Sequence, residues 1–257
     1  MQQDKKPESL IKYGDIFKLG EHLLLCGDAG DKELVNKFLK GRRIKEIICD
    51  PPFGVAAVES KSSFKQKMSK PKPILNDQLQ TKEEYTSFTK RWLEPILPSL
   101  TDKNALYIFN ASKMISALGA GLEELGLTNQ HFLIWLKNQA VIGRSDYLPQ
   151  YEFIVYTWKG RREFVRSKAK GVFFYPKPHK SKFHPTTKPV GLIRELILNS
   201  SRIGDTIYDC FLGSGTTLLA AEQTKRKCLA VELDPEYVQT AIDRFYSLTG
   251  IKAEKIN

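Results

Sequence analysis

Short apolar runs rich in β-branched residues alternate with longer stretches of helical spacing along most of this sequence. Seven runs predict strands, at residues 22–28, 44–50, 105–110, 131–137, 151–158, 206–211 and 227–233. Six stretches predict helices, at 31–40, 82–100 with a break near Pro95 and Pro98, 112–125, 188–201, 215–224 and 235–247. This alternation is typical of a parallel sheet covered on both faces. The sequence therefore predicts an α/β fold with a seven-stranded, mainly parallel sheet and helices on both faces.

Length and composition fit a single domain over residues 1–257. With 41% hydrophobic residues the chain can build a large core. It has neither a hydrophobic leader nor a run of about 18 apolar residues, so we expect a cytoplasmic protein without a membrane span. The four cysteines lack metal-ligand and CxxC spacing. They predict buried, reduced thiols, and we expect no metal site.

The net charge of +11 is concentrated in two segments. Residues 60–73 hold five lysines and no acid, and residues 159–182 hold nine Lys or Arg and one Glu. Both lie in stretches without helical or strand periodicity, at 54–80 and 160–183, which we predict to be long loops. Cations clustered on an otherwise near-neutral chain indicate a polyanionic partner such as nucleic acid.

A glycine-rich turn follows the predicted strand 206–211 and leads into the predicted helix 215–224. Gly213 and Gly215 let the backbone approach a ligand closely, and the helix N-terminus offers free N–H groups. Glu232 ends the next strand about 20 residues later, where a carboxylate can accept hydrogen bonds from ribose hydroxyls. A plain tight turn with a solvated acid is the alternative. Because no third glycine completes the G-x-G-x-x-G pattern, an adenosine-containing cofactor other than NAD is favoured.

Three motifs together resemble the amino-methyltransferases of DNA. Residues 50–53 (DPPF) match the catalytic motif of that family, 211–216 (FLGSGT) match its cofactor motif, and 184–189 (HPTTKP) match the segment before the cofactor motif. The order, with the catalytic motif first, resembles the circularly permuted β-type group. The resemblance covers residues 23–244. It implies a Rossmann-like sheet, S-adenosylmethionine as methyl donor, double-stranded DNA as substrate, and a prokaryotic or phage source.

The DPPF residues suit methyl transfer to an exocyclic amino group. The lone pair of such a nitrogen is delocalised into the base, and two acceptors aimed at its N–H groups favour the geometry that frees it. Asp50 can supply one acceptor and the Pro51 carbonyl the other, while Pro51 and Pro52 restrict the backbone. Phe53 is the predicted platform for a base flipped out of the duplex, with a core phenylalanine as the alternative. By family tendency, a carboxylate at position 50 favours N6 of adenine over N4 of cytosine.

The resemblance also implies a set of cofactor-binding residues. Asp28 resembles an acid near the cofactor, and Lys188 a lysine that faces the cofactor carboxylate; a helix cap and a solvated lysine are the alternatives. For Thr216 and Thr217, which would add hydroxyl contacts there, the alternative is a helix cap. The predicted set is Asp28, Lys188, Asp209, Phe211, Gly213, Ser214, Gly215, Thr216, Thr217 and Glu232. Other residues also resemble family positions, and core packing is the expectation for them: Trp135, Lys137, Tyr151 and Glu152.

The two basic loops supply the predicted DNA contacts. Loop 160–183 combines cations with aromatic residues and is the candidate target-recognition segment, while loop 54–80 follows the catalytic motif and could close over a flipped base. Loop 160–183 is short for a complete recognition domain, so the alternatives are a homodimer, a partner subunit from a restriction system, or a relaxed sequence specificity. The predicted DNA-binding residues are Lys61, Lys65, Lys67, Arg161, Arg162, Arg166, Lys168 and Lys170.

Other functions stand as alternatives. Methylation of cytosine N4 or of RNA would use the same chemistry. A nicotinamide-dependent oxidoreductase would explain the glycine turn and Glu232 but not the DPPF motif. A non-catalytic nucleic-acid-binding module would explain the basic loops but neither of the two nucleoside-type motifs. Binding of S-adenosylmethionine, of NAD, or of DNA alone separates these classes.

Overall fold

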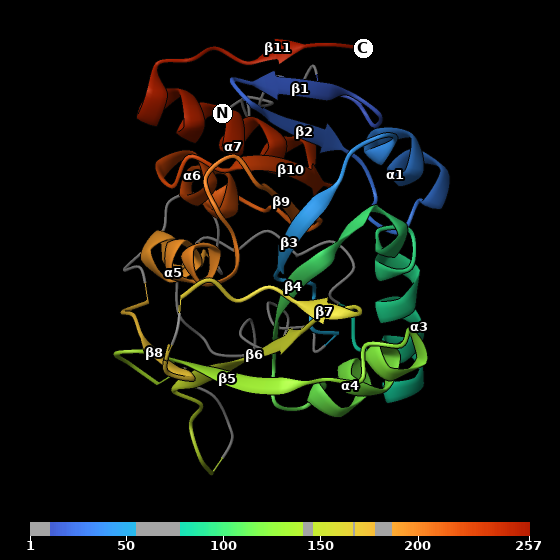
Figure 1. Cartoon of the computed structure of the whole chain (residues 1–257), viewed down its shortest axis with the longest axis vertical. Helices are drawn as coiled ribbons and strands as arrows, with labels where there is room; N and C mark the ends of the chain where they lie inside the picture. Colours follow the sequence, from blue (N-terminus) through green and yellow to red (C-terminus); the bar gives the residue numbers. More distant parts are fainter. Residues whose placement is uncertain (1–10, 55–77, 141–145, 167, 178–186) are drawn as a thin grey trace, which may run out of the picture.

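The computed structural model describes residues 11–54, 78–140, 146–166, 168–177 and 187–257, which form one eleven-stranded sheet with helices on both faces (Figure 1). Across the sheet the strand order is β11 (Glu254–Lys255), β1 (Ile16–Leu19), β2 (His22–Cys26), β10 (Lys227–Glu232), β9 (Thr206–Asp209), β3 (Ile44–Cys49), β4 (Leu100–Asn110), β6 (Tyr151–Thr157), β5 (His131–Leu136) and β8 (Val172–Phe174). The remaining strand, β7 (Arg161–Arg162), pairs with β4 outside this path.

All seven predicted strands are present, in the sheet order β2, β10, β9, β3, β4, β6 and β5. They run parallel except β6, which is antiparallel to both of its neighbours. The prediction of a Rossmann-like, mainly parallel sheet is confirmed, while the circular permutation stays a prediction. The added strands β1, β7, β8 and β11 contain two to four residues each, too few to leave a periodic signal in the sequence.

The stretch predicted as a helix over 82–100 divides near its prolines. α3 (Lys82–Leu93) begins after Thr81, which forms a capping box with Glu84. The helix ends before Pro95, because proline has no N–H to continue the hydrogen-bond ladder. A 3-10 turn, η1 (Leu97–Ser99), follows, and β4 already begins at Leu100 rather than at the predicted position 105.

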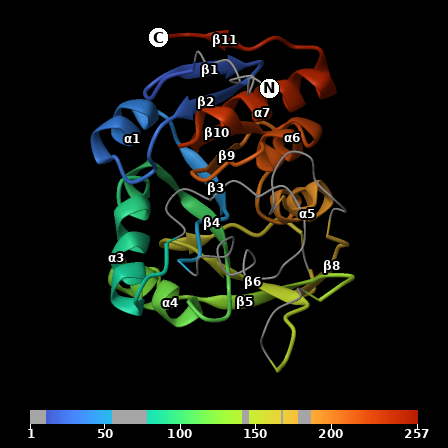
Figure 2. The ribbon, with the colours of Figure 1, turned by 180° about the vertical axis from the view of Figure 1, so that it is seen from behind.

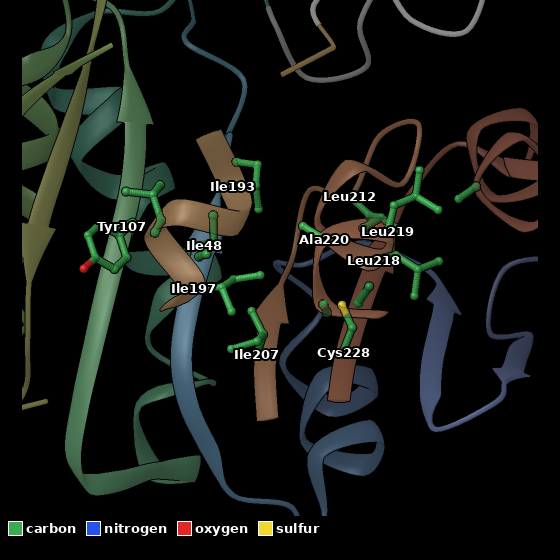
Figure 3. Packing of buried hydrophobic residues seen from close by; sticks show 14 of the residues in the cluster. Ile48, Tyr107, Ile193, Ile197, Ile207, Leu212, Leu218, Leu219, Ala220 and Cys228 are labelled. Carbon is green, nitrogen blue, oxygen red and sulfur yellow. The ribbon is translucent and has the colours of Figure 1, made fainter. Parts of the chain in front are cut away.

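Two groups of helices cover the two faces of the sheet (Figures 1 and 2). One group contains α5 (Val190–Ser200), α6 (Thr216–Gln223) and α7 (Pro235–Thr249), and the other contains α1 (Lys32–Leu39), α3 and α4 (Ile115–Glu124). Because successive strand residues point to opposite faces, β3 contributes to both cores. Ile48 packs with Ile193 and Ile197 of α5, as Figure 3 shows, whereas Ile47 joins the core beneath the other group.

The neighbouring parallel strands β3 and β9 bring the DPPF motif and the glycine-rich turn together. Cys49 ends β3 and Cys210 follows β9, and their Sγ atoms lie 3.4 Å apart although 161 positions separate them in the sequence. All four cysteines are buried and free, as predicted. In open α/β sheets, ligands bind at the carboxyl ends of such strands. The fold therefore places both motifs where a ligand site is expected.

Part of the predicted loop 160–183 forms strands, so the prediction of a purely irregular segment was wrong there. β7 pairs with Lys103 and Asn104 of β4, and β8 pairs with β5. Both strands depend on pairing with distant residues, which the local sequence pattern does not contain. Of the other basic loop, residues 55–77 lie outside the described residues. Among the described helices, none has the length and apolar character needed to cross a membrane.

Candidate active site

A pocket lies at the carboxyl ends of β3 and β9, beside the starts of α5 and α6. Ile48, Phe109 and Ile193 contribute apolar walls. Apolar walls with a few convergent polar groups are typical of sites for small molecules. Eight residues that were predicted from the sequence line this pocket: Asp50, Lys188, Asp209, Phe211, Gly213, Ser214, Thr216 and Thr217.

The glycine-rich turn depends on a backbone that other residues adopt poorly. Gly215 caps α6 with a φ of +90°, and a Cβ there would lie 2.9 Å from the Cβ of Ala241. Arg244 of α7, which the sequence analysis missed, donates from Nη1 to Ser214 Oγ at 2.9 Å. The turn is thus fixed from α7. Neither Thr216 nor Thr217 is the helix cap, which excludes the capping alternative for them.

Two buried acids hold this turn from the strand side. Glu232 accepts hydrogen bonds from the backbone N–H groups of Gly213, at 2.7 Å, and of Asp234, at 2.9 Å. Asp209 Oδ1 accepts one from the N–H of Phe211 at 3.0 Å. Burial raises the pKa of each carboxyl to about 7, although these hydrogen bonds oppose the rise. Asp209 lines the pocket, and the contact of Glu232 with a ribose stays a prediction.

Four charged side chains form a cluster beside the turn, here named the charge cluster: Asp50 after β3, Lys137 after β5, Glu152 on β6 and Lys188 before α5. Lys188 Nζ donates to Asp50 Oδ2 and lies 3.2 Å from Glu152 Oε2. Lys137 Nζ lies 2.7 Å from Glu152 Oε1. The side chains of Lys188 and Lys137 are only 6% and 4% exposed. Because two cations balance two anions, the cluster can be buried without net charge.

The charge states in the cluster depend on this pairing. Burial alone would lower the pKa of Lys188, but Asp50 and Glu152 outweigh it and raise that pKa. Burial would raise the pKa of Glu152, but Lys188 and Lys137 outweigh it and lower that pKa. For Asp50, burial outweighs Lys188 and the pKa is raised. Lys188 is therefore a buried ion-pair partner and not a solvated lysine, and Lys137 and Glu152 do more than pack in the core.

Asp50 keeps one oxygen for a ligand. Its Oδ1 atom is shielded from solvent and accepts no hydrogen bond from the described residues. Phe53 is half-buried and packs against the core beneath α5, with its ring centre 5.7 Å from Lys188 Nζ. The rings of Phe109 and Trp135 lie 5.1 Å and 5.9 Å from the same nitrogen. Pro51 is buried and Pro52 half-buried. A shielded acceptor beside aromatic surface suits a donor on a planar ring.

Asp28 does not line the pocket. Its Oδ1 accepts a hydrogen bond from the N–H of Gly30 at 2.8 Å, and its Oδ2 lies 3.1 Å from Nη2 of Arg91 on α3. Asp31 is the residue that caps α1, so the helix-cap alternative for Asp28 was wrong. A part for Asp28 in cofactor binding stays a prediction.

The predicted DNA-binding residues are spread over the structure. Arg161 and Arg162 are exposed, and β7 places them beside Lys103 and Asn104, at the start of β4. From Asn104, β4 continues to Asn110, which at about 3.3 Å per residue is roughly 20 Å. These arginines therefore lie toward the amino end of β4, whereas the pocket lies at the carboxyl ends of the strands. Arg166, Lys168 and Lys170 are exposed, while other predicted contacts lie outside the described residues: Lys61, Lys65 and Lys67.

Fold and site together define a class: Rossmann-like α/β proteins in which a glycine-rich cofactor turn adjoins an acidic motif for a planar amino substrate. Within this class, the chain belongs to the DNA methylase family, whose profile matches residues 44–243. The match confirms two predictions from the sequence, a DNA amino-methyltransferase and S-adenosylmethionine as its methyl donor. It favours an enzyme over a non-catalytic module and transfer of a methyl group over hydride transfer.

Individual relatives agree with the family. The type II methyltransferase M.HpaI of Haemophilus parainfluenzae is 27% identical, over 87% of this chain and 74% of its own length. The crystal structure of the M1.HpyAVI–SAM complex has a TM-score of 0.62 at 25% identity and covers 86% of this chain and 98% of its own. The PvuII DNA methyltransferase, described as cytosine-N4-specific, has a TM-score of 0.71 at 17% identity, covering 91% and 90%. This last likeness concerns the fold alone.

Proposed function

We propose that the chain is a site-specific DNA methyltransferase that methylates N6 of adenine in duplex DNA after flipping the base. The observation that carries the proposal is Asp50 Oδ1, a buried acceptor without a donor among the described residues. The Pro51 carbonyl is the second acceptor for the two N–H groups of adenine. The carboxylate at position 50, through the family tendency, supports adenine over cytosine.

The residues of the pocket have separate tasks in this reaction. When bound, S-adenosylmethionine supplies an electrophilic methyl group. The glycine-rich turn, with Thr216 and Thr217, holds the cofactor beside Asp209. Asp50 orients the amino group so that its lone pair faces the methyl group, and it accepts the proton that the nitrogen releases. Phe53 provides aromatic surface for the flipped base.

We further propose that the basic loops bind the phosphate backbone. Loop 54–80 directly follows the DPPF motif, which supports a place close to the flipped base. The exposed cations of loop 160–183 support a wider DNA contact or a surface toward a second subunit. A homodimer or a partner from a restriction system would supply the recognition surface that the short loop lacks, and the type II methyltransferases among the relatives support a place in a restriction system.

A labelling experiment tests the proposal. The protein is incubated with tritiated S-adenosylmethionine and unmethylated duplex DNA, the DNA is digested to nucleosides, and the labelled nucleoside is identified. We expect N6-methyladenosine, and for Asp50→Asn a fall of at least about a hundredfold with cofactor binding kept. Glu222→Gln, an acid outside both basic loops that pairs with His22 at the amino end of β2, away from the pocket, is the control. Label in N4-methylcytosine would correct the target, and label on RNA alone or on no nucleic acid would contradict the proposal.

A further inference from the structure

We propose that Glu152 is a positioning residue: it holds the Lys188 ammonium between two carboxylates and thereby keeps Asp50 Oδ1 free for the amino group of the substrate. The inference rests on the proposed function, because the free oxygen acts in catalysis only if an amino group binds there. Neither the DPPF motif nor the glycine-rich turn includes Glu152, which comes from β6.

The position of Lys188 explains why one oxygen of Asp50 is free. An ammonium group carries three donors, and with Asp50 as its sole anion it could bond to both carboxylate oxygens. Instead, Nζ donates to Oδ2 and lies 3.2 Å from Glu152 Oε2 on its other side. Oδ1 receives no hydrogen bond within the described part of the chain. Glu152 therefore decides which oxygen the lysine occupies.

Lys137 holds Glu152 in turn. Its Nζ lies 2.7 Å from Glu152 Oε1 and 5.0 Å from the centre of the Trp135 ring, the residue that pairs with Glu152 across β5 and β6. The backbone of Lys137 exchanges hydrogen bonds with Gln150: its N–H donates to the Gln150 carbonyl at 2.8 Å, and the Gln150 side chain donates to its carbonyl at 2.9 Å. These contacts hold both the backbone and the ammonium group of Lys137 in place. If Glu152 turned away, the buried Lys137 ammonium would lose its anionic partner.

The cluster also sets the charge around Asp50. The described charged groups that act on Asp50 are Lys188, Glu152 and Lys137, and Asp209 faces it from β9. Glu152 raises the pKa of Asp50 and also that of Lys188. Without its charge both values fall. The acidic limb of the pH–rate profile, where Asp50 ionises, should then move to lower pH.

Glu152→Gln tests the inference. We expect kcat to fall about tenfold to a hundredfold because the acceptor is misplaced, with KM for S-adenosylmethionine changed less than about threefold. The acidic limb of the pH profile should move to lower pH, and Glu152→Asp should restore part of kcat. Glu222→Gln is the control, since Glu222 lies outside both basic loops and is paired at 2.8 Å with the buried His22, at the amino end of β2 and away from the pocket. It should change neither kcat nor the pH profile.

The outcomes separate this inference from the proposed function. A wild-type protein that labels DNA, together with a Glu152→Gln variant whose kcat and pH profile are unchanged, would overturn the inference alone. A wild-type protein that labels no DNA would overturn the proposed function. In that case ¹³C NMR of the Asp50 carboxyl, assigned with Asp50→Asn, still decides the arrangement. Its titration midpoint should move to lower pH in Glu152→Gln, and an unchanged midpoint would show that Glu152 does not act on Asp50.

Discussion

Two carboxylates near opposite ends of strand β3 are in opposite situations. Asp50, just beyond its carboxyl end, is paired with Lys188 and keeps one oxygen free. Glu46, nearer the amino end, is fully buried, and neither oxygen accepts a hydrogen bond from a described residue. Burial raises the pKa of Glu46 well above its ordinary value, and Ser201 and Arg226, which act in the opposite direction, do not offset the rise. Burial alone therefore does not mark a functional acid, whereas pairing with a buried cation keeps a carboxylate available as an acceptor.

Removing Lys188 should leave Asp50 without its paired cation, which is the situation of Glu46 in the wild type. Lys188→Met leaves the partly buried Asp50 and Glu152 with Lys137 as their nearest cation, and we expect the free energy of unfolding to fall by about 3–5 kcal/mol at neutral pH. The loss should shrink at lower pH, where protonation neutralises the two carboxylates. Urea unfolding at several pH values measures it. Lys45→Met removes the cation of another ion pair, and an equal loss there would contradict a special role for the charge cluster.

Replacing Glu46 should instead increase the free energy of unfolding. Glu46→Met removes two buried oxygens without partners, and we expect a gain of about 1–3 kcal/mol in the free energy of unfolding. The gain should grow with pH. Because the pKa of Glu46 is raised in the folded state, the unfolded chain releases this proton first, and the wild type loses stability as pH rises. Urea midpoints at acidic and alkaline pH test this, with Glu163→Met, which removes a paired acid, expected to destabilise.

Asp209 combines features of Asp50 and Glu46. It lines the pocket and accepts a hydrogen bond from Phe211, yet burial raises its pKa from 3.8 to about 7. The wild type should therefore lose stability as pH rises from about 4 through about 7. Asp209→Asn keeps an oxygen for the Phe211 N–H and should flatten this slope, with a gain on the order of a few kcal/mol above that range and little change below it. Thermal unfolding across this range measures the slope, and an unaltered slope would refute the assignment.

The smallest effect on stability is expected for the exposed arginines near the start of β4. Changing Arg161 and Arg162 together to Ala should alter the free energy of unfolding by no more than about 0.5 kcal/mol. If they contact phosphates, affinity for duplex DNA should fall severalfold and depend less steeply on salt. Fluorescence anisotropy at several salt concentrations measures both. Unchanged affinity and salt dependence would show that Arg161 and Arg162 do not contact DNA, unlike the residues proposed to bind the flipped base around Asp50.

Local sequence patterns were enough to predict the main helices and strands, but not which strands pair or which distant side chains meet. The seven predicted strands were found because strands buried on both faces are nearly continuous apolar runs. β7 and β8 were missed because they exist only through pairing with β4 and β5. In the site, the motif residues that line the pocket were predicted, whereas Arg244 was not, because its bond to Ser214 joins α7 to a turn that no sequence spacing connects with it.

By itself, the sequence determined the class of fold, the cofactor turn and the acidic motif, because each depends on residues close together along the chain. Only the tertiary structure decided how the charges of the site are balanced. Lys137, Glu152 and Lys188 come from separate elements, and the register of β5 against β6 and the start of α5 bring them to Asp50. Coulomb interactions act through space and strengthen where water is excluded. The pairing that distinguishes Asp50 from Glu46 therefore exists only in the folded protein.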